Sequence, residues 1–168
     1  MLILIIGTPD SGKSQKAEQL VLERSLPENR IYLATMLPFG EQGRERVEKH
    51  RQMRAGKGFW TIEAPFDADQ AVLKLDDPTR WDVLLECVSN LTANELFERG
   101  TTPEETVKRV TGQIRRLAAA ARSVTAVTNH FEIEETFDEE TRVYAETLDR
   151  INEMIREMAD ETIEVCVY

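Results

Sequence analysis

Short apolar runs alternate with longer amphipathic stretches along this chain. Most of the runs are rich in Leu, Ile and Val, which is typical of strands that are covered on both faces of a sheet. Turn residues such as Gly, Pro, Asn and Asp separate the runs from the stretches that follow. Strands are predicted at 2–6, 31–35, 59–62, 83–87, 124–128 and 162–167.

The amphipathic stretches predict helices. In the last of them, Tyr144, Leu148, Ile151 and Ile155 recur at spacings of four and three residues and so share one helical face. Helices are predicted at about 13–24, 41–54, 67–75, 91–99, 103–121 and 144–158. Strands that alternate with helices in this way form βαβ units, so we expect an α/β fold with a mostly parallel central sheet flanked by helices.

Two local signals support these helix starts. Thr102, Pro103 and Glu105 supply an N-cap residue, a proline at the first helical position and the glutamate of a capping box. Pro38 and Gly40 are expected to break the chain before the charged helix at 41–54.

Composition and charge narrow the class of protein. The chain has 168 residues, of which 41% are hydrophobic, so we expect one domain spanning 1–168. Its net charge of −10 disfavours binding to a nucleic-acid backbone. No apolar run approaches the roughly 20 residues of a membrane span, and the run at 2–6 is too short for a signal-peptide core. We therefore expect a cytoplasmic protein in which Cys87 and Cys166 are buried, reduced thiols.

A glycine-rich segment follows the first predicted strand directly. Its eight residues match the pattern G-x-x-x-x-G-K-S and are Gly7, Thr8, Pro9, Asp10, Ser11, Gly12, Lys13 and Ser14. Such a loop turns successive backbone N–H groups towards an anion at the start of a helix. We expect Lys13 to reach the β and γ phosphates of a nucleotide and Ser14 to ligate Mg²⁺. The sequence thus predicts a single P-loop nucleotide-binding domain.

An acidic residue is expected near this loop as the second Mg²⁺ partner. Glu86 closes the apolar run at 83–85, and ligands of α/β sheets bind at the carboxyl ends of parallel strands. We expect Glu86 to end a strand that neighbours the first one. Asp82 is the weaker alternative, because it precedes the same run.

Basic residues are concentrated around His50. Six of the chain's 21 basic residues lie between positions 44 and 57, and Arg46, His50 and Arg54 share one face of the predicted helix. This arrangement favours a surface that docks polyphosphate. A neutral imidazole at its centre can attack phosphorus and carry a phosphoramidate, and cationic neighbours favour the neutral form. The alternative is a surface histidine without a chemical role.

Several segments together resemble the bifunctional adenosylcobinamide kinase / adenosylcobinamide-phosphate guanylyltransferase family of cobalamin synthesis. The resemblance covers most of the chain. Its most specific parts are the His50 segment, the Leu-Leu-Glu-Cys run with a following Asn94, and Val-Thr-Asn. The segments are 7–14, 31–35, 46–51, 60–63, 84–87 with Asn94, 127–129, Arg142 and 150–152.

The resemblance implies a concrete function. The chain would phosphorylate adenosylcobinamide with ATP or GTP, and it would transfer GMP from GTP, through guanylylated His50, to adenosylcobinamide phosphate. It also implies a single P-loop domain, Mg²⁺, a corrinoid partner and a homotrimer. The implied nucleotide contacts outside the loop are Ala34, Thr35, Arg51, Glu63 and Glu86, to which we add Met36 and Arg54 as neighbours of these positions.

The chain departs from the family pattern at two places. The family loop usually reads Gly-Gly-x-Arg-Ser-Gly-Lys-Ser, whereas Thr8 and Asp10 stand here at the second glycine and the arginine. After Val-Thr-Asn the family carries Glu-Val-Gly, whereas this chain continues with His130 and an acidic stretch at 132–140. His130 either replaces the missing acid or is a simple loop histidine.

Two other functions remain open at this point. One is a P-loop kinase for another small molecule, in which His50 only contacts phosphate. The other is a non-enzymatic protein that senses GTP or takes part in an assembly, with the acidic stretch at 132–140 as its contact surface.

Overall fold

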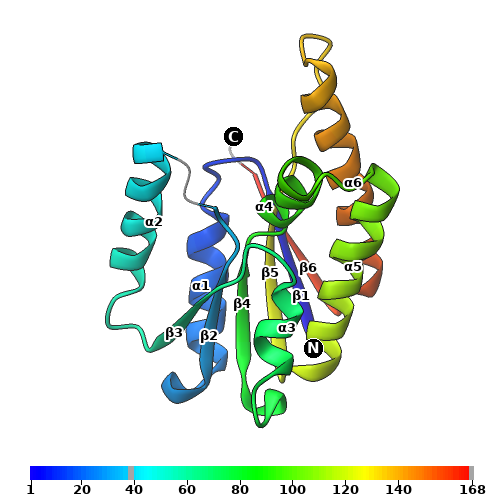
Figure 1. Ribbon diagram of the computed structural model, residues 1–168. Helices are drawn as coiled ribbons and strands as arrows, with labels where there is room; N and C mark the ends of the chain where they lie inside the picture. Colours follow the sequence, from blue (N-terminus) through cyan, green and yellow to red (C-terminus); the bar gives the residue numbers. More distant parts are fainter. Residues whose placement is uncertain (38–39, 167–168) are drawn as a thin grey trace.

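A six-stranded, fully parallel sheet forms the centre of the protein. We describe it from a computed structural model, in which residues 1–37 and 40–166 are described (Figure 1). The strand order across the sheet is β3-β2-β4-β5-β1-β6. The strands are β1 (Leu2–Gly7), β2 (Arg30–Ala34), β3 (Phe59–Glu63), β4 (Asp82–Glu86), β5 (Ser123–Asn129) and β6 (Glu161–Val165).

Helices cover both faces of this sheet. Apolar side chains of α1 pack against one face, and those of α3, α4, α5 and α6 pack against the other. Figure 1 shows α2 on the outside of α1, at the β2–β3 end of the sheet. The helices are α1 (Lys13–Arg24), α2 (Gly40–Arg54), α3 (Ala68–Leu73), α4 (Val88–Ala93), α5 (Pro103–Ala120) and α6 (Glu139–Met158).

The alternation of side chains along each strand determines which residues meet which helix. Ile3 and Ile5 of β1 pack with Leu20 and Val21 of α1, whereas Leu4 packs in the core beneath the other helices. Because the face changes with each residue, Gly7, two positions after Ile5, belongs to the α1 face. This parity brings the start of the glycine-rich segment to the same face as α1.

Most predicted elements are confirmed within one or two residues at their ends, although α6 starts at Glu139, five residues before the predicted start at Tyr144. The capping box at the start of α5 is present, since Thr102 Oγ accepts from the Glu105 N–H at 3.2 Å and Glu105 reaches back to the Thr102 N–H. The predicted break at Pro38 and the end of the last predicted strand, Val167, lie outside the described residues.

Two predictions about local structure are wrong. The helix predicted at 91–99 starts earlier, at Val88, and its second half is a π-helical turn from Asn94 to Arg99. This turn is stabilised by Glu95, which is fully buried and pairs with Arg99 at 3.2 Å and with Arg109 of α5 at 2.9 Å. The two cysteines were predicted to be buried, but Cys87 is only half-buried and Cys166 is exposed, next to the edge strand β6.

Candidate functional site

The glycine-rich segment turns tightly between β1 and α1, and its glycines are required for two different reasons. Gly12 has φ of +85°, a left-handed conformation that favours glycine. Gly7 is limited by space, because a Cβ there would lie 2.2 Å from the Val165 carbonyl oxygen and 2.7 Å from Ser11 Oγ. Asp10 also has a positive φ, of 59°. The backbone is thus folded into the compact turn that the sequence predicts.

Lys13 points back over this turn. Its side chain is buried, and its Nζ donates to the Thr8 carbonyl at 3.1 Å. Burial lowers the pKa of Lys13, while the negative charge of Glu86 and of Asp10 raises it. Within the described residues, the buried Ser11 Oγ has no hydrogen-bond partner. Lys13 therefore places a cation over the turn, as a phosphate cradle requires.

Ser14 and Glu86 meet at the start of α1, as predicted. The Ser14 hydroxyl donates to Glu86 Oε2 at 3.2 Å. Burial raises the pKa of Glu86, and the Ser14 hydrogen bond together with the charges of Lys13 and Arg54 opposes this shift. The expectation that Glu86 ends a strand next to the first one is wrong, because β5 is inserted between β1 and β4.

The Ser14–Glu86 pair fits a magnesium ion that is shared with a nucleotide. Mg²⁺ binds oxygen ligands at about 2.1 Å in an octahedron, so two adjacent ligands lie about 3 Å apart. The 3.2 Å separation of the two oxygens agrees with this spacing. No group of three or more His, Cys, Asp or Glu side chains within the described residues could hold a metal by itself. Phosphate oxygens and water would complete the shell.

The segment after β2 is tied to the segment after β4. The hydroxyl of Thr35 donates to the Cys87 carbonyl at 2.9 Å and accepts from the Cys87 N–H at 2.6 Å. The amide of Asn94 donates to the Thr35 and Pro65 carbonyls at 2.8 and 2.9 Å. Ala34, Thr35 and Met36 are therefore held at the same edge of the sheet as Glu86.

His50 lies in α2, which the structure places against the flank of α1. The guanidinium of Arg54 stacks on the ring of Tyr32 at 3.6 Å, and Lys57, just beyond the helix, forms an ion pair with Glu18 of α1. Arg54 is buried, and its Nε has no partner within the described residues. Tyr32 packs with α1 in the core on the α1 face of the sheet (the α1-side core). Because Arg54 of α2 stacks on Tyr32, α2 lies on the same face of the sheet as the phosphate loop.

The environment of His50 favours a neutral imidazole. His50 is half-buried, and burial lowers its pKa. The positive charges of Arg54, Arg46 and Lys49 lower it further, while Glu18 raises it. Burial and the basic cluster thus both favour the neutral form of the ring.

The predicted site residues form two groups rather than one. The loop, Lys13, Ser14 and Glu86 make one group. His50, Arg51 and Arg54 make the other, in which Arg51 forms an ion pair with Glu63. Arg54 links the two groups, because its charge lowers the pKa of both His50 and Glu86.

Sequence reasoning missed two residues that border both groups. Glu18 follows Ser14 by one helical turn on α1, and this i, i+4 spacing is the signal that could have found it. Tyr32 lies within the β2 run, where it looks like any buried aromatic residue. Its contact with Arg54 depends on how α2 packs, and no local pattern reveals that.

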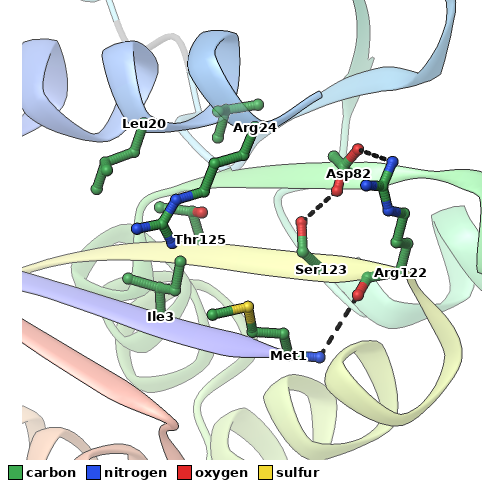
Figure 2. Close-up of a pocket in the computed structure, with 9 residues that line it drawn as sticks. Met1, Ile3, Leu20, Arg24, Asp82, Arg122, Ser123 and Thr125 are labelled. Atoms are coloured by element: carbon green, nitrogen blue, oxygen red, sulfur yellow. Dashed lines mark hydrogen bonds and ion pairs between the residues drawn. The ribbon is translucent and has the colours of Figure 1, made fainter. Parts of the chain in front are cut away.

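A separate pocket of about 240 Å³ lies at the amino ends of the strands, where β1 begins, at the end of the sheet away from the phosphate loop. Figure 2 shows Asp82 there, paired with Arg122 and hydrogen-bonded to Ser123. Asp82, the weaker acidic candidate, thus lies away from the phosphate loop. Because its charge is already paired with Arg122, we do not regard this pocket as the functional site.

The sheet order, the glycine-rich loop between β1 and α1 and the acid at the end of β4 define an α/β protein of the P-loop class. The crystal structure of the flagellar accessory protein FlaH from Methanocaldococcus jannaschii has the same fold, with a TM-score of 0.51 at 17% sequence identity. That match covers 97% of this chain and 70% of FlaH. None of the helices in the described ranges 1–37 and 40–166 is both long and apolar enough to span a membrane.

Within that class the family is established by sequence. Residues 3–167 match the family described as cobinamide kinase / cobinamide phosphate guanyltransferase (CobU), so the chain belongs to this family. It is 35% identical over 100 residues to the bifunctional adenosylcobalamin biosynthesis protein CobU of Escherichia coli K12. That match covers 60% of this chain and 52% of the E. coli protein, so it spans about half the length of that relative.

Proposed function

We propose that this protein phosphorylates adenosylcobinamide and then transfers GMP from GTP to adenosylcobinamide phosphate. The observation that carries the proposal is the Ser14–Glu86 contact of 3.2 Å beside buried Lys13, in a chain of the CobU family. A lysine, a hydroxyl and a carboxylate in this arrangement are the groups that hold a magnesium triphosphate.

In the kinase step, the loop holds the phosphates while the substrate alcohol attacks. The oxygen of the alcohol forms a bond to the γ phosphorus and its proton passes to solvent, while the bond from the γ phosphorus to the β-phosphate oxygen breaks and a nucleoside diphosphate leaves. Lys13 and the loop N–H groups neutralise the charge that collects on the phosphate oxygens. Mg²⁺, when bound between Ser14 and Glu86, supplies further charge neutralisation.

In the guanylyl step, His50 is the nucleophile. A ring nitrogen forms a bond to the α phosphorus of GTP, and pyrophosphate leaves with the electrons of the broken P–O bond. A phosphate oxygen of adenosylcobinamide phosphate then attacks the same phosphorus and displaces the imidazole. The neutral ring supports the first attack, because the lone pair of an imidazolium nitrogen is occupied by a proton.

This step requires His50 to approach the loop. Of the α2 side chains that are described, only Arg54 is buried, so the helix is held mainly by that stack and by the Lys57–Glu18 ion pair next to it. Among the described side chains of α2, little apolar packing opposes a shift of the helix towards the phosphates. The cations Arg46 and Lys49 would then face the phosphate tail, which favours the approach.

A labelling experiment tests the guanylyl step. GTP labelled at the α phosphorus and mixed with Mg²⁺ should label the wild-type protein, and the label should be absent from His50→Ala. The matched control is His130→Ala, which removes the other histidine and should keep the label. Because the pKa of His50 lies below its usual 6.5, the labelling rate should rise with pH and reach half of its plateau below pH 6.5. Equal labelling of His50→Ala and wild type would contradict the proposal.

One observation favours a second candidate, a P-loop kinase without guanylyl transfer. The groups that influence the pKa of His50 most, after burial, are residues of its own helix and Glu18 of α1, not residues of the phosphate loop. In that case ATP-dependent phosphorylation of another small-molecule alcohol would survive in His50→Ala, and the wild type would take up no label from GTP. The homotrimer implied by the family resemblance stays a prediction, which light scattering of the purified protein would test.

A further inference from the structure

Asn129 lies at the level of the first glycine of the phosphate loop. It is the last residue of β5, the strand inserted between β1 and β4, and it is in register with Gly7. The next backbone N–H, of His130, donates to the Gly7 carbonyl at 2.9 Å. Glu86 is in register with Val127, so Asn129 stands two residues, about 7 Å, beyond the level of Glu86.

The Asn129 side chain belongs to the face of the sheet that α1 covers. Val127 packs in the α1-side core, whereas the hydroxyl of Thr128 donates to Asn152 of α6 on the other face, at 2.7 Å. Because successive side chains alternate between faces, Asn129 returns to the α1 face, where Glu86 meets Ser14. The carboxamide therefore lies on the loop side of the sheet. Across the sheet, its strand β5 lies between β1, which carries Gly7, and β4, which carries Glu86.

The backbone at this point is held by buried side chains from the opposite layer. Ser89 of α4 accepts from the Asn129 N–H at 3.0 Å, and Asn152 donates to the Asn129 carbonyl at 3.0 Å. Ser89 and Asn152 are only 1% and 4% exposed. Within the described residues, the Asn129 carboxamide itself takes part in no hydrogen bond. The structure thus fixes the main chain firmly and leaves the amide free.

From this placement we propose that Asn129 is a nucleotide-binding residue whose carboxamide donates a hydrogen bond to the terminal phosphate of a bound triphosphate. This inference rests on the proposed function of the loop and adds a residue to it. A neutral amide suits the position, because it donates to phosphate without forming an ion pair with Glu86. Lys13 is the only basic residue between positions 7 and 14, so a further donor from β5 complements the loop.

The proposal predicts discrimination between triphosphate and diphosphate. A hydrogen bond to a charged group contributes on the order of 1.5–3 kcal/mol, so its loss weakens binding by about tenfold or more. Asn129→Ala should weaken binding of the β,γ-imido analogue of GTP, with Mg²⁺, by at least about tenfold. Binding of GDP should change by less than about twofold. Asn129→Asp has the same shape but carries a charge that repels phosphate, so it should weaken analogue binding more than the alanine variant does.

Isothermal titration calorimetry of the full chain tests this prediction. The matched control is Asn29→Ala, since Asn29 lies in the turn before β2 at the far edge of the sheet and accepts from Arg80 at 3.2 Å. The control should leave both affinities unchanged. If the alanine variant does not fold, Asn129→Leu, which is uncharged, close to asparagine in size and unable to donate, gives the same comparison.

Two results would overturn the inference. One is a parallel loss of analogue and GDP binding, which would indicate a structural role for the side chain. The other is no change in either affinity. If the wild type binds neither nucleotide while Asn29→Ala and the wild type are both folded, the proposed function of the loop fails together with this inference. If the wild type binds nucleotide and Asn129→Ala shows the same ratio of analogue affinity to GDP affinity, only the inference about Asn129 is overturned. The proposed function of the loop then stands.

Discussion

Replacing Glu86 by glutamine separates the stability of the free protein from its affinity for magnesium nucleotide. Glu86 is partly buried, and its Oε2 accepts from the Ser14 hydroxyl at 3.2 Å. Glutamine keeps this acceptor and the side-chain shape but carries no charge. Because burial raises the pKa of Glu86, the ionised carboxylate is disfavoured in the free protein. The variant should therefore be more stable than the wild type when no ligand is present.

The size of this effect follows from the cost of a buried charge that nearby cations only partly offset. We expect about 1 kcal/mol at pH 7, which corresponds to about 2–4 °C in melting temperature for a chain of this length. The folded protein favours the protonated acid, so the penalty in the wild type appears as pH rises above the ordinary value of 4.5. The advantage of the variant should therefore disappear as pH falls below about 4.5.

Magnesium nucleotide should reverse the order. Loss of the carboxylate weakens Mg²⁺-dependent GTP binding by about tenfold or more, which removes about 1.4 kcal/mol of ligand stabilisation. Without ligand, the variant should melt at a higher temperature than the wild type. At concentrations of Mg²⁺ and GTP that saturate the wild type, the variant should melt no higher than the wild type. Thermal unfolding at several pH values, with and without ligand, measures both effects.

The matched control for this experiment is Glu161→Gln, a half-exposed glutamate that pairs with Arg24 at 3.6 Å where β6 begins. Surface pairs contribute little, so the control should change neither melting temperature by more than about 1 °C. A free Glu86→Gln protein that is less stable than the wild type, with an unchanged shift on adding Mg²⁺ and GTP, would refute the reasoning about Glu86.

Three further predictions concern single side chains. Lys13→Ala should weaken nucleotide binding by about 100-fold or more in calorimetry, since it removes the buried cation of the loop; unchanged affinity would contradict the cradle. Asn94→Ala should lower the free energy of unfolding in urea by about 2–4 kcal/mol, because two carbonyls lose their donor; a cost below about 0.5 kcal/mol would contradict the coupling of the two segments. Thr102→Ala should cost about 1 kcal/mol in the same assay through the lost N-cap of α5; no cost would show that the cap is redundant.

The parts of the site that depend on contiguous residues could be predicted from the sequence. The loop at 7–14 carries its own conformation, since Gly12 and the strand and helix around it are adjacent in the chain. The pairing of Ser14 with Glu86 could also be predicted, because parallel strands end at one edge of the sheet. What the pattern did not show is the order of the strands, so β5 and its terminal Asn129 were not expected between the loop and the acid.

The remaining differences come from long-range packing. The π-helical turn at Asn94 depends on Glu95 pairing with Arg109, 14 residues further along. The helix that carries His50 was predicted correctly, but its place against α1 depends on Arg54 stacking on Tyr32. Such contacts join segments that no local pattern connects.

The most direct test of the account is the intact mass of the wild-type protein after incubation with GTP and Mg²⁺. The account predicts a gain of one GMP per chain that is absent from His50→Ala and from Lys13→Ala. A folded wild-type protein that binds GTP and gains no mass would contradict guanylylation of His50.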